Sequence, residues 1–191
     1  MPILGTIASQ ITGKLNTWQP TSAYDALGTI IVPSGGLTSI TFAGLPQSGY
    51  SHLQVRIFAR TNRASTRDGI KLRLNSDSGT NYAQHNVFAD GSTISATGYP
   101  NEPEMALDSV SAATASANMF GSIVVDILDY ANANKTTTVR SFGGNDGNGD
   151  GKINFTSNLW NNTAAVNTLY FAPYSGTSFN QYSSFALYGV K

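Results

Sequence analysis

The sequence predicts an all-β protein that folds as a single antiparallel β-sandwich, similar to a jelly roll. Charged residues make up only 12% of the 191 residues, about half the usual share, whereas 10% are aromatic and 19 are glycine. Thr, Ser and Asn fill most polar positions, as on outward strand faces and in turns, and the residues of long surface helices are scarce. Short apolar segments recur between turn residues, which is typical of sandwiches and jelly rolls.

Nine segments have the composition of strands. In residues 52–60, Leu53, Val55 and Ile57 alternate with polar neighbours, which indicates a sheet with one face toward water. The turn sequences PSGG, PQSGY and SDSGTN separate the first of these segments. The predicted strands are 24–32, 37–44, 52–60, 69–76, 82–89, 119–130, 135–144, 167–173 and 183–190.

One long interval, residues 90–118, lacks this pattern. It is rich in Ala, Ser and Thr and contains Pro100 and Pro103. We predict a loop that crosses one end of the sandwich, with a helical turn over 102–110 that begins near Pro103.

The N-terminal segment differs from the rest, so we divide the chain into a packing or anchoring segment, 1–20, and a β-sandwich domain, 21–191. We predict a short helical or extended arm, which is marginal alone and needs a neighbour in this domain or in another subunit. It lacks the basic start of a signal peptide, and no stretch reaches the roughly 20 apolar residues that span a bilayer, so we expect no membrane partner. The apolar residues recur every fourth position and are the predicted assembly residues: Ile3, Ile7, Ile11 and Leu15.

Charge and cysteine content exclude several classes of function. Eleven Lys and Arg balance eleven Asp and Glu, and the chain contains no cysteine. The balanced charge gives no reason to expect a nucleic-acid partner. Without cysteine there is no disulfide framework, zinc-thiolate site or cysteine nucleophile.

The sequence also lacks a recognisable catalytic constellation. No serine lies in a nucleophile motif such as G-x-S-x-G. Two acid pairs, Asp126 with Asp129 and Glu102 with Glu104, have nothing around them that marks a glycosidase site. We therefore predict that the protein is not an enzyme and assign no catalytic residue.

A run of basic residues is the strongest charge feature. Its centre, Arg60, Arg63 and Arg67, is a candidate surface for an anionic glycan or for an acidic patch on a neighbouring subunit. The alternative, which we favour, is a solvated hairpin whose arginines face water and keep a sheet edge from pairing. Six of the eleven cations lie in this run: Arg56, Arg60, Arg63, Arg67, Lys71 and Arg73.

Aromatic residues gather near the C-terminus. Exposed Tyr and Trp rings can stack on sugars, but we expect most of these side chains to line the core. The cluster consists of Trp160, Tyr170, Phe171, Tyr174, Phe179, Tyr182, Phe185 and Tyr188.

The stretch GGNDGNGDGKINF, residues 143–155, resembles the start of an EF-hand calcium loop. Its weak candidate ligands are Asp146, Asn148, Asp150 and the Lys152 carbonyl, but Ser157 stands where the loop needs a bidentate Glu. The flanking residues have strand composition. We therefore favour a glycine-rich turn between two strands and no cofactor, with calcium as the alternative.

Several long runs together resemble a family of virion structural proteins of tailed bacteriophages, many of them from phages of marine bacteria, cyanobacteria included. The runs are MPILGTIASQITGKL, SHLQVRIFARTNR, LRLNSDSGTNYAQHN, SANMFGSIVVDILDYANANKTTTVRSFGG and YSSFALYGVK. The resemblance covers most of the chain and implies a structural part of the virion, tail- or capsid-associated.

The resemblance sets the functional expectation. We expect a non-enzymatic virion component, either a tail or fibre appendage or a capsid decoration, attached to other virion proteins through its N-terminal segment. Family analogy implies a homo-oligomer, often a trimer. The alternative is a β-sandwich module that binds a host surface glycan or receptor.

Overall fold

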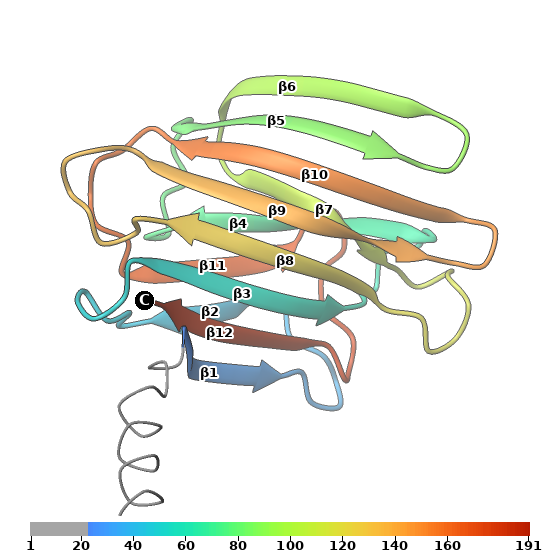
Figure 1. The fold of residues 1–191 in the computed structure, drawn as a ribbon. Helices are drawn as coiled ribbons and strands as arrows, with labels where there is room; N and C mark the ends of the chain where they lie inside the picture. The colour runs from blue at the N-terminus through green and yellow to red at the C-terminus, as the bar shows by residue number, and fades with distance from the viewer. Residues whose placement is uncertain (1–22) are drawn as a thin grey trace, which may run out of the picture.

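The computed structural model describes residues 23–191, and these form two antiparallel β-sheets packed face to face (Figure 1). The described residues contain no α-helix, so the all-β prediction is confirmed. None of them forms a helical segment with the length and apolar character of a membrane span. The predictions for residues 1–20 lie outside the described residues, including the assembly stripe of Ile3, Ile7, Ile11 and Leu15.

The described residues form twelve strands. The larger sheet has the order β1-β12-β3-β8-β9-β10-β5-β6, and the smaller sheet has the order β2-β11-β4-β7. The strands are β1 (Tyr24–Ile31), β2 (Ile40–Ala43), β3 (His52–Ala59), β4 (Arg67–Leu74), β5 (Tyr82–Ala89), β6 (Ile94–Glu102), β7 (Met105–Ser111), β8 (Gly121–Leu128), β9 (Thr137–Asp146), β10 (Gly151–Trp160), β11 (Thr168–Pro173) and β12 (Ser184–Val190).

Eight of these strands form a jelly roll. The group β1-β12-β3-β8 of the larger sheet belongs with β2-β11-β4-β7, the smaller sheet. Each of the pairs β1–β2, β3–β4, β7–β8 and β11–β12 is consecutive in the chain and crosses from one sheet to the other. This is the double Greek key of a jelly roll, so the predicted architecture is confirmed. The other four strands are the hairpins β5–β6 and β9–β10, which widen the larger sheet (Figure 1).

The loop predicted over residues 90–118 is wrong for most of its length. Residues 94–102 form β6 and residues 105–111 form β7, so the helical turn predicted over 102–110 is absent. The side chains of Met105, Leu107 and Val110 are buried between the sheets, and this burial outweighs the weak local preference for a turn. Proline is tolerated in β6 because β6 is an edge strand, where a missing N–H breaks no inner ladder.

The core lies between the two sheets and is built by alternation along the strands. In β3, β4 and β8 the buried apolar side chains occupy every second position, as the alternating sequence predicts, and in β4 the first buried position is taken by Asp68. The C-terminal aromatic cluster contributes Phe171, Phe179 and Phe185, whose rings touch one another at centroid distances of 5.0 to 5.7 Å. We expected most of this cluster to line the core, but only these three and Trp160, half of the eight, are buried, while Tyr174 and Tyr182 are exposed.

Candidate functional site

The basic run does not form a hairpin, contrary to the prediction. Its two strands, β3 and β4, belong to opposite sheets, because the chain crosses the sandwich between them. Both are inner strands, so their arginines protect no sheet edge. The loop between them, residues 60–66, lies at one end of the jelly roll instead.

Each cation of the run has a partner inside the molecule. Arg63 lies 3.8 Å from the carboxylate of Asp68 and donates to the carbonyl of Arg67. The guanidinium of Arg67 lies 3.3 Å from Asp150 and also donates to the carbonyl of Gly151. The others pair Lys71 and Arg73 with Glu104 and place Arg56 over the rings of Tyr24 and Tyr188.

Arg60 stabilises the β7–β8 loop by hydrogen bonds to its backbone. Its two terminal nitrogens donate four hydrogen bonds of 2.7 to 3.2 Å to backbone carbonyls of the β7–β8 loop, those of Ala113, Ala115, Ser116 and Met119. These nitrogens therefore hold the loop together, and little of their donor capacity is left for a ligand.

The glycine-rich stretch forms the β9–β10 hairpin, as we favoured. Asp146 pairs with Gly151 across the hairpin, and the intervening residues 147–150 make the turn. Asn148 and Gly149 both have positive φ, 57° and 112°, which is the Asn-Gly signature of a tight hairpin.

The acids of this hairpin are already engaged. The Asp146 carboxylate accepts the Asn148 N–H at 2.9 Å, and Asp150 pairs with Arg67. Lys152 is paired with Asn145 in the ladder, and its ammonium group lies 3.8 Å from the ring centroid of Phe88. Within residues 23–191, no three His, Asp or Glu side chains gather in a way that could hold a metal ion.

The two histidines lie far apart in the larger sheet. His52 begins β3, and His85 lies on β5, with β8, β9 and β10 between them. His52 accepts the backbone N–H of Asp129 and lies 3.5 Å from its carboxylate.

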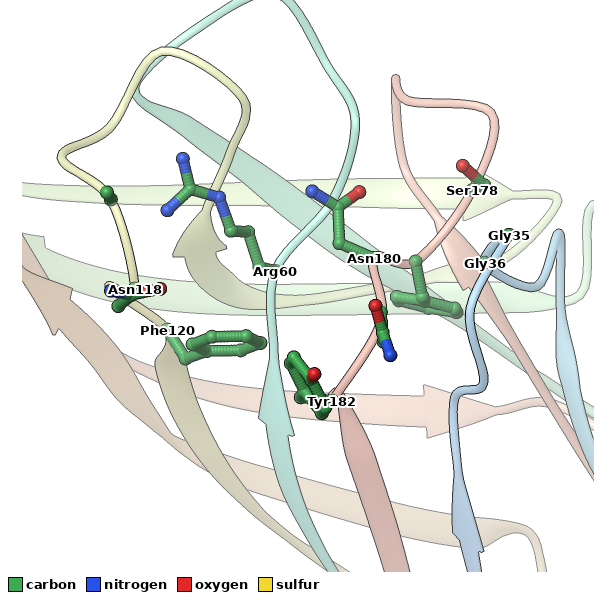
Figure 2. Close-up of a pocket in the computed structure, with 11 residues that line it drawn as sticks. Gly35, Gly36, Arg60, Asn118, Phe120, Ser178, Asn180 and Tyr182 are labelled. Atoms are coloured by element: carbon green, nitrogen blue, oxygen red, sulfur yellow. The ribbon is translucent and has the colours of Figure 1, made fainter.

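A cavity of about 430 Å³ opens at the end of the jelly roll where four loops meet. These loops connect β1 to β2, β3 to β4, β7 to β8 and β11 to β12. Figure 2 shows Arg60, Phe120, Asn180 and Tyr182 around this space, on three of the four loops. Tyr182 is 68% exposed, whereas the neighbouring Phe179 is fully buried.

Hydrogen bonds between loops fix the walls of this cavity. The buried carboxylate of Asp68 accepts from the hydroxyl of Thr61 and from the backbone N–H groups of Ser175 and Gly176. Asn62 accepts the N–H groups of Thr177 and Ser178. The β11–β12 loop is thus tied to the β3–β4 loop.

The second unusual surface is the outer face of the larger sheet. Val124, Phe142, Phe155 and Val87 are directly opposite one another on β8, β9, β10 and β5. They point away from the core and are 37%, 52%, 45% and 43% exposed, respectively. We call these four residues the apolar row.

Further apolar side chains extend this surface. The row next to it carries Phe58, Ile153 and Ile94, which are 47%, 51% and 79% exposed. On the other side lies a polar row, in which Asp126 and Arg140 are directly opposite each other. The sheet face is therefore apolar at the end near the cavity and polar beyond it.

Sequence reasoning missed the apolar row and most residues of the cavity, although two residues that it named, Arg60 and Tyr182, line the cavity. The apolar row had a signal: Ile123, Val124 and Val125 are consecutive, so both faces of β8 carry apolar side chains. Phe142 and Phe155 join Val124 only through the strand register, which spacing in sequence does not give. Tyr182 lay within the aromatic cluster, but nothing in the sequence separates it from its buried neighbours.

Comparisons with known proteins place the chain in no family. No protein-family model matches it, and no curated protein matches it. One solved structure, galectin LEC-6 of Caenorhabditis elegans, is 13% identical over 85% of this chain and 95% of that chain, with a TM-score of 0.32. A superposition this loose does not establish a shared fold or a shared ligand.

Proposed function

We propose that this protein is a non-enzymatic structural subunit of a tailed-phage virion, a tail or fibre appendage or a capsid decoration. In this proposal, copies of the β-sandwich associate through the outer face of the larger sheet. The observation that carries the association is the apolar row, Val124–Phe142–Phe155–Val87, exposed across four neighbouring strands. The virion assignment rests on the sequence resemblance described above.

The apolar row is unusual for a surface that meets only water. Monomeric proteins scatter single apolar side chains over their surface, whereas contiguous patches mark binding sites. Covering the row and its neighbours Phe58 and Ile153 would remove apolar area from water, which favours association by about 25 cal/mol for each Å².

The polar row argues for a second copy of the same chain as the occupant. Asp126 and Arg140 lie side by side on this face, and within residues 23–191 Arg140 forms no ion pair. When two such faces meet about a two-fold axis, each acid can lie against the partner's base. The zero net charge of the chain adds no long-range repulsion between copies.

This face-to-face contact is isologous and gives pairs. It therefore differs from the three-fold arrangement that family analogy implies, and the mass of the assembly distinguishes the two. An attachment through the N-terminal segment would then join such pairs to other virion proteins.

The association is tested by measuring the mass of the full chain by light scattering over a range of concentrations. We expect a dimer that dissociates in the double variant Phe142→Ser, Phe155→Ser. The matched control is Tyr174→Ser, which removes an aromatic ring of 48% exposure from another surface. A monomeric wild-type chain, or a double variant that dimerises as the wild type does, would overturn the proposed interface.

The virion role needs a separate experiment. Mass spectrometry and a density map of intact particles should find this chain as a stoichiometric component. A chain that lacks residues 1–16 should fold but fail to join particles if the N-terminal segment is the attachment. Normal incorporation of the truncated chain would contradict that attachment.

A further inference from the structure

The loop cavity at the end of the jelly roll combines two aromatic rings, one exposed and one half-buried, with amide and hydroxyl groups. Phe120 and Tyr182 provide the rings, while Asn118, Asn180 and Ser178 provide polar side chains. Phe120 is supported from behind by Phe58, whose ring stacks on it at a centroid distance of 5.0 Å and an interplanar angle of 15°. The cavity thus presents rigid apolar surfaces beside uncharged hydrogen-bonding groups.

One lining residue, Tyr182, is held in a strained backbone conformation. Tyr182 has φ of 73°, in the left-handed region that residues other than Gly and Asn rarely adopt, whereas Asn118, with φ of 63°, suits that region. Strain of this kind persists only where the surroundings enforce it, and it is concentrated at functional sites. At Tyr182 the result is a bulky ring that is turned outward and left 68% exposed.

The strained segment is fixed without a ligand. The Tyr182 N–H donates to the Val32 carbonyl at 3.0 Å, and the Asn180 N–H donates to the Arg60 carbonyl at 2.8 Å. Ser183, directly after Tyr182, is buried and accepts the Arg60 N–H on its hydroxyl. A ligand would therefore meet a preformed site and lose little free energy in ordering it.

The charge of the cavity restricts the ligand. No carboxylate lines it, and its one cation, Arg60, has both terminal nitrogens bound to the carbonyls of the β7–β8 loop. An anionic ligand would have to compete with those four bonds. An uncharged ligand with hydroxyl groups and flat C–H faces would use the amides and the rings directly.

We propose that this loop cavity binds a neutral saccharide, with a sugar ring stacked on Tyr182 or Phe120 and its hydroxyl groups hydrogen-bonded to Asn118, Asn180 and Ser178. This goes beyond the structural role proposed above and does not depend on it. If copies associate through the outer face of the larger sheet, the loop end of the jelly roll with its sugar site would lie at the edge of that interface.

Saturation-transfer NMR and calorimetry on the full chain test the proposal, with a panel of neutral oligosaccharides of glucose, galactose, mannose and N-acetylglucosamine. Sialylated and uronic-acid oligosaccharides form the anionic arm. We expect at least one neutral oligosaccharide to bind and the anionic ones to bind more weakly. No binding across the neutral panel, or a clear preference for the anionic arm, would overturn the proposal.

Two variants locate the site. Tyr182→Asn removes the ring while keeping a residue that tolerates positive φ, so the loop should stay folded, and we expect about tenfold weaker binding. Asn118→Gly removes the amide under the same backbone condition and should also weaken binding. The control is Tyr174→Asn, on the same loop and 48% exposed but outside the cavity, which should bind as the wild type does. Unchanged affinity in Tyr182→Asn, or an equal loss in the control, would place the sugar elsewhere.

Discussion

Arg67 and Asp150 lie 3.3 Å apart, and this ion pair joins the basic run to the glycine-rich hairpin. Arg67 and Asp150 are 83 positions apart in sequence, and the sequence alone indicates two separate binding candidates. In the structure they bind each other. Arg67 also donates to the Gly151 carbonyl, so the arginine fixes the base of the hairpin turn.

This pairing leads to a prediction about calcium. Because Asp150 is paired and Asp146 accepts a hydrogen bond within the turn, we expect 1 mM calcium to leave the thermal midpoint of the wild-type chain unchanged. Binding with a dissociation constant of 1 mM would already add about 0.4 kcal/mol. Metal analysis of the purified protein provides the check, and one calcium ion per chain would contradict the expectation.

The sheet interface makes a charge-reversal prediction. Asp126→Arg places like charges against each other across the proposed two-fold contact, so we expect self-association to weaken at least tenfold. The exchange variant Asp126→Arg, Arg140→Asp restores opposite charges and should recover dimerisation. Light scattering measures both, and thermal unfolding shows whether each monomer is folded. A weakened single variant that the exchange does not rescue would argue against an isologous contact.

The buried Asp68 makes a stability prediction. Its carboxylate accepts hydrogen bonds from Thr61 and from the N–H groups of Gly69, Ser175 and Gly176, with no exposure to water. Asp68→Ala leaves these donors without their acceptor, so we expect a loss of about 3 kcal/mol or more. Urea unfolding measures the loss. The control Asp90→Ala, at an exposed turn, should lose much less.

Because of Tyr82, we predict that the free energy of unfolding falls at alkaline pH. Burial raises the pKa of Tyr82 to about 12, whereas an unfolded tyrosine titrates near 10. The stabilisation is therefore complete below about pH 10 and is lost as the pH rises toward 12. Tyr82→Phe should remove this part of the pH dependence. At neutral pH it should cost about 1 to 3 kcal/mol, because the Leu74 N–H loses the phenol oxygen as its acceptor.

Because of Asp77, we predict that the free energy of unfolding also falls at acidic pH. The hydrogen bond from the buried Trp160 indole, 2.8 Å long, lowers the pKa of Asp77. A lowered folded pKa means that the stabilisation is present above about pH 3.9 and disappears as the pH falls through the folded value. Asp77→Asn keeps an acceptor but cannot titrate. Its deficit in unfolding free energy relative to the wild type should therefore shrink between pH 7 and pH 3.

The sequence by itself determined the fold class and most of the strands. The alternation of Leu53, Val55 and Ile57, and the turn residues between segments, are local signals that survive in the fold because burial of one strand face dominates the energetics. The Asn148-Gly149 turn is equally local. The strands β6 and β7 could not be predicted from the sequence, because the burial of this region depends on the opposite sheet and not on its own composition.

Only the tertiary structure decided where the functional surfaces lie. Phe142 and Phe155 become neighbours of Val124 through strand register. Tyr182 and Phe120 line one cavity because two sheet crossings bring distant loops to one end of the jelly roll. The arginines of the basic run likewise pair with groups inside the molecule, because packing brings segments that are distant in sequence together. Strand register and sheet crossings are set by long-range packing, and no short window of sequence carries them.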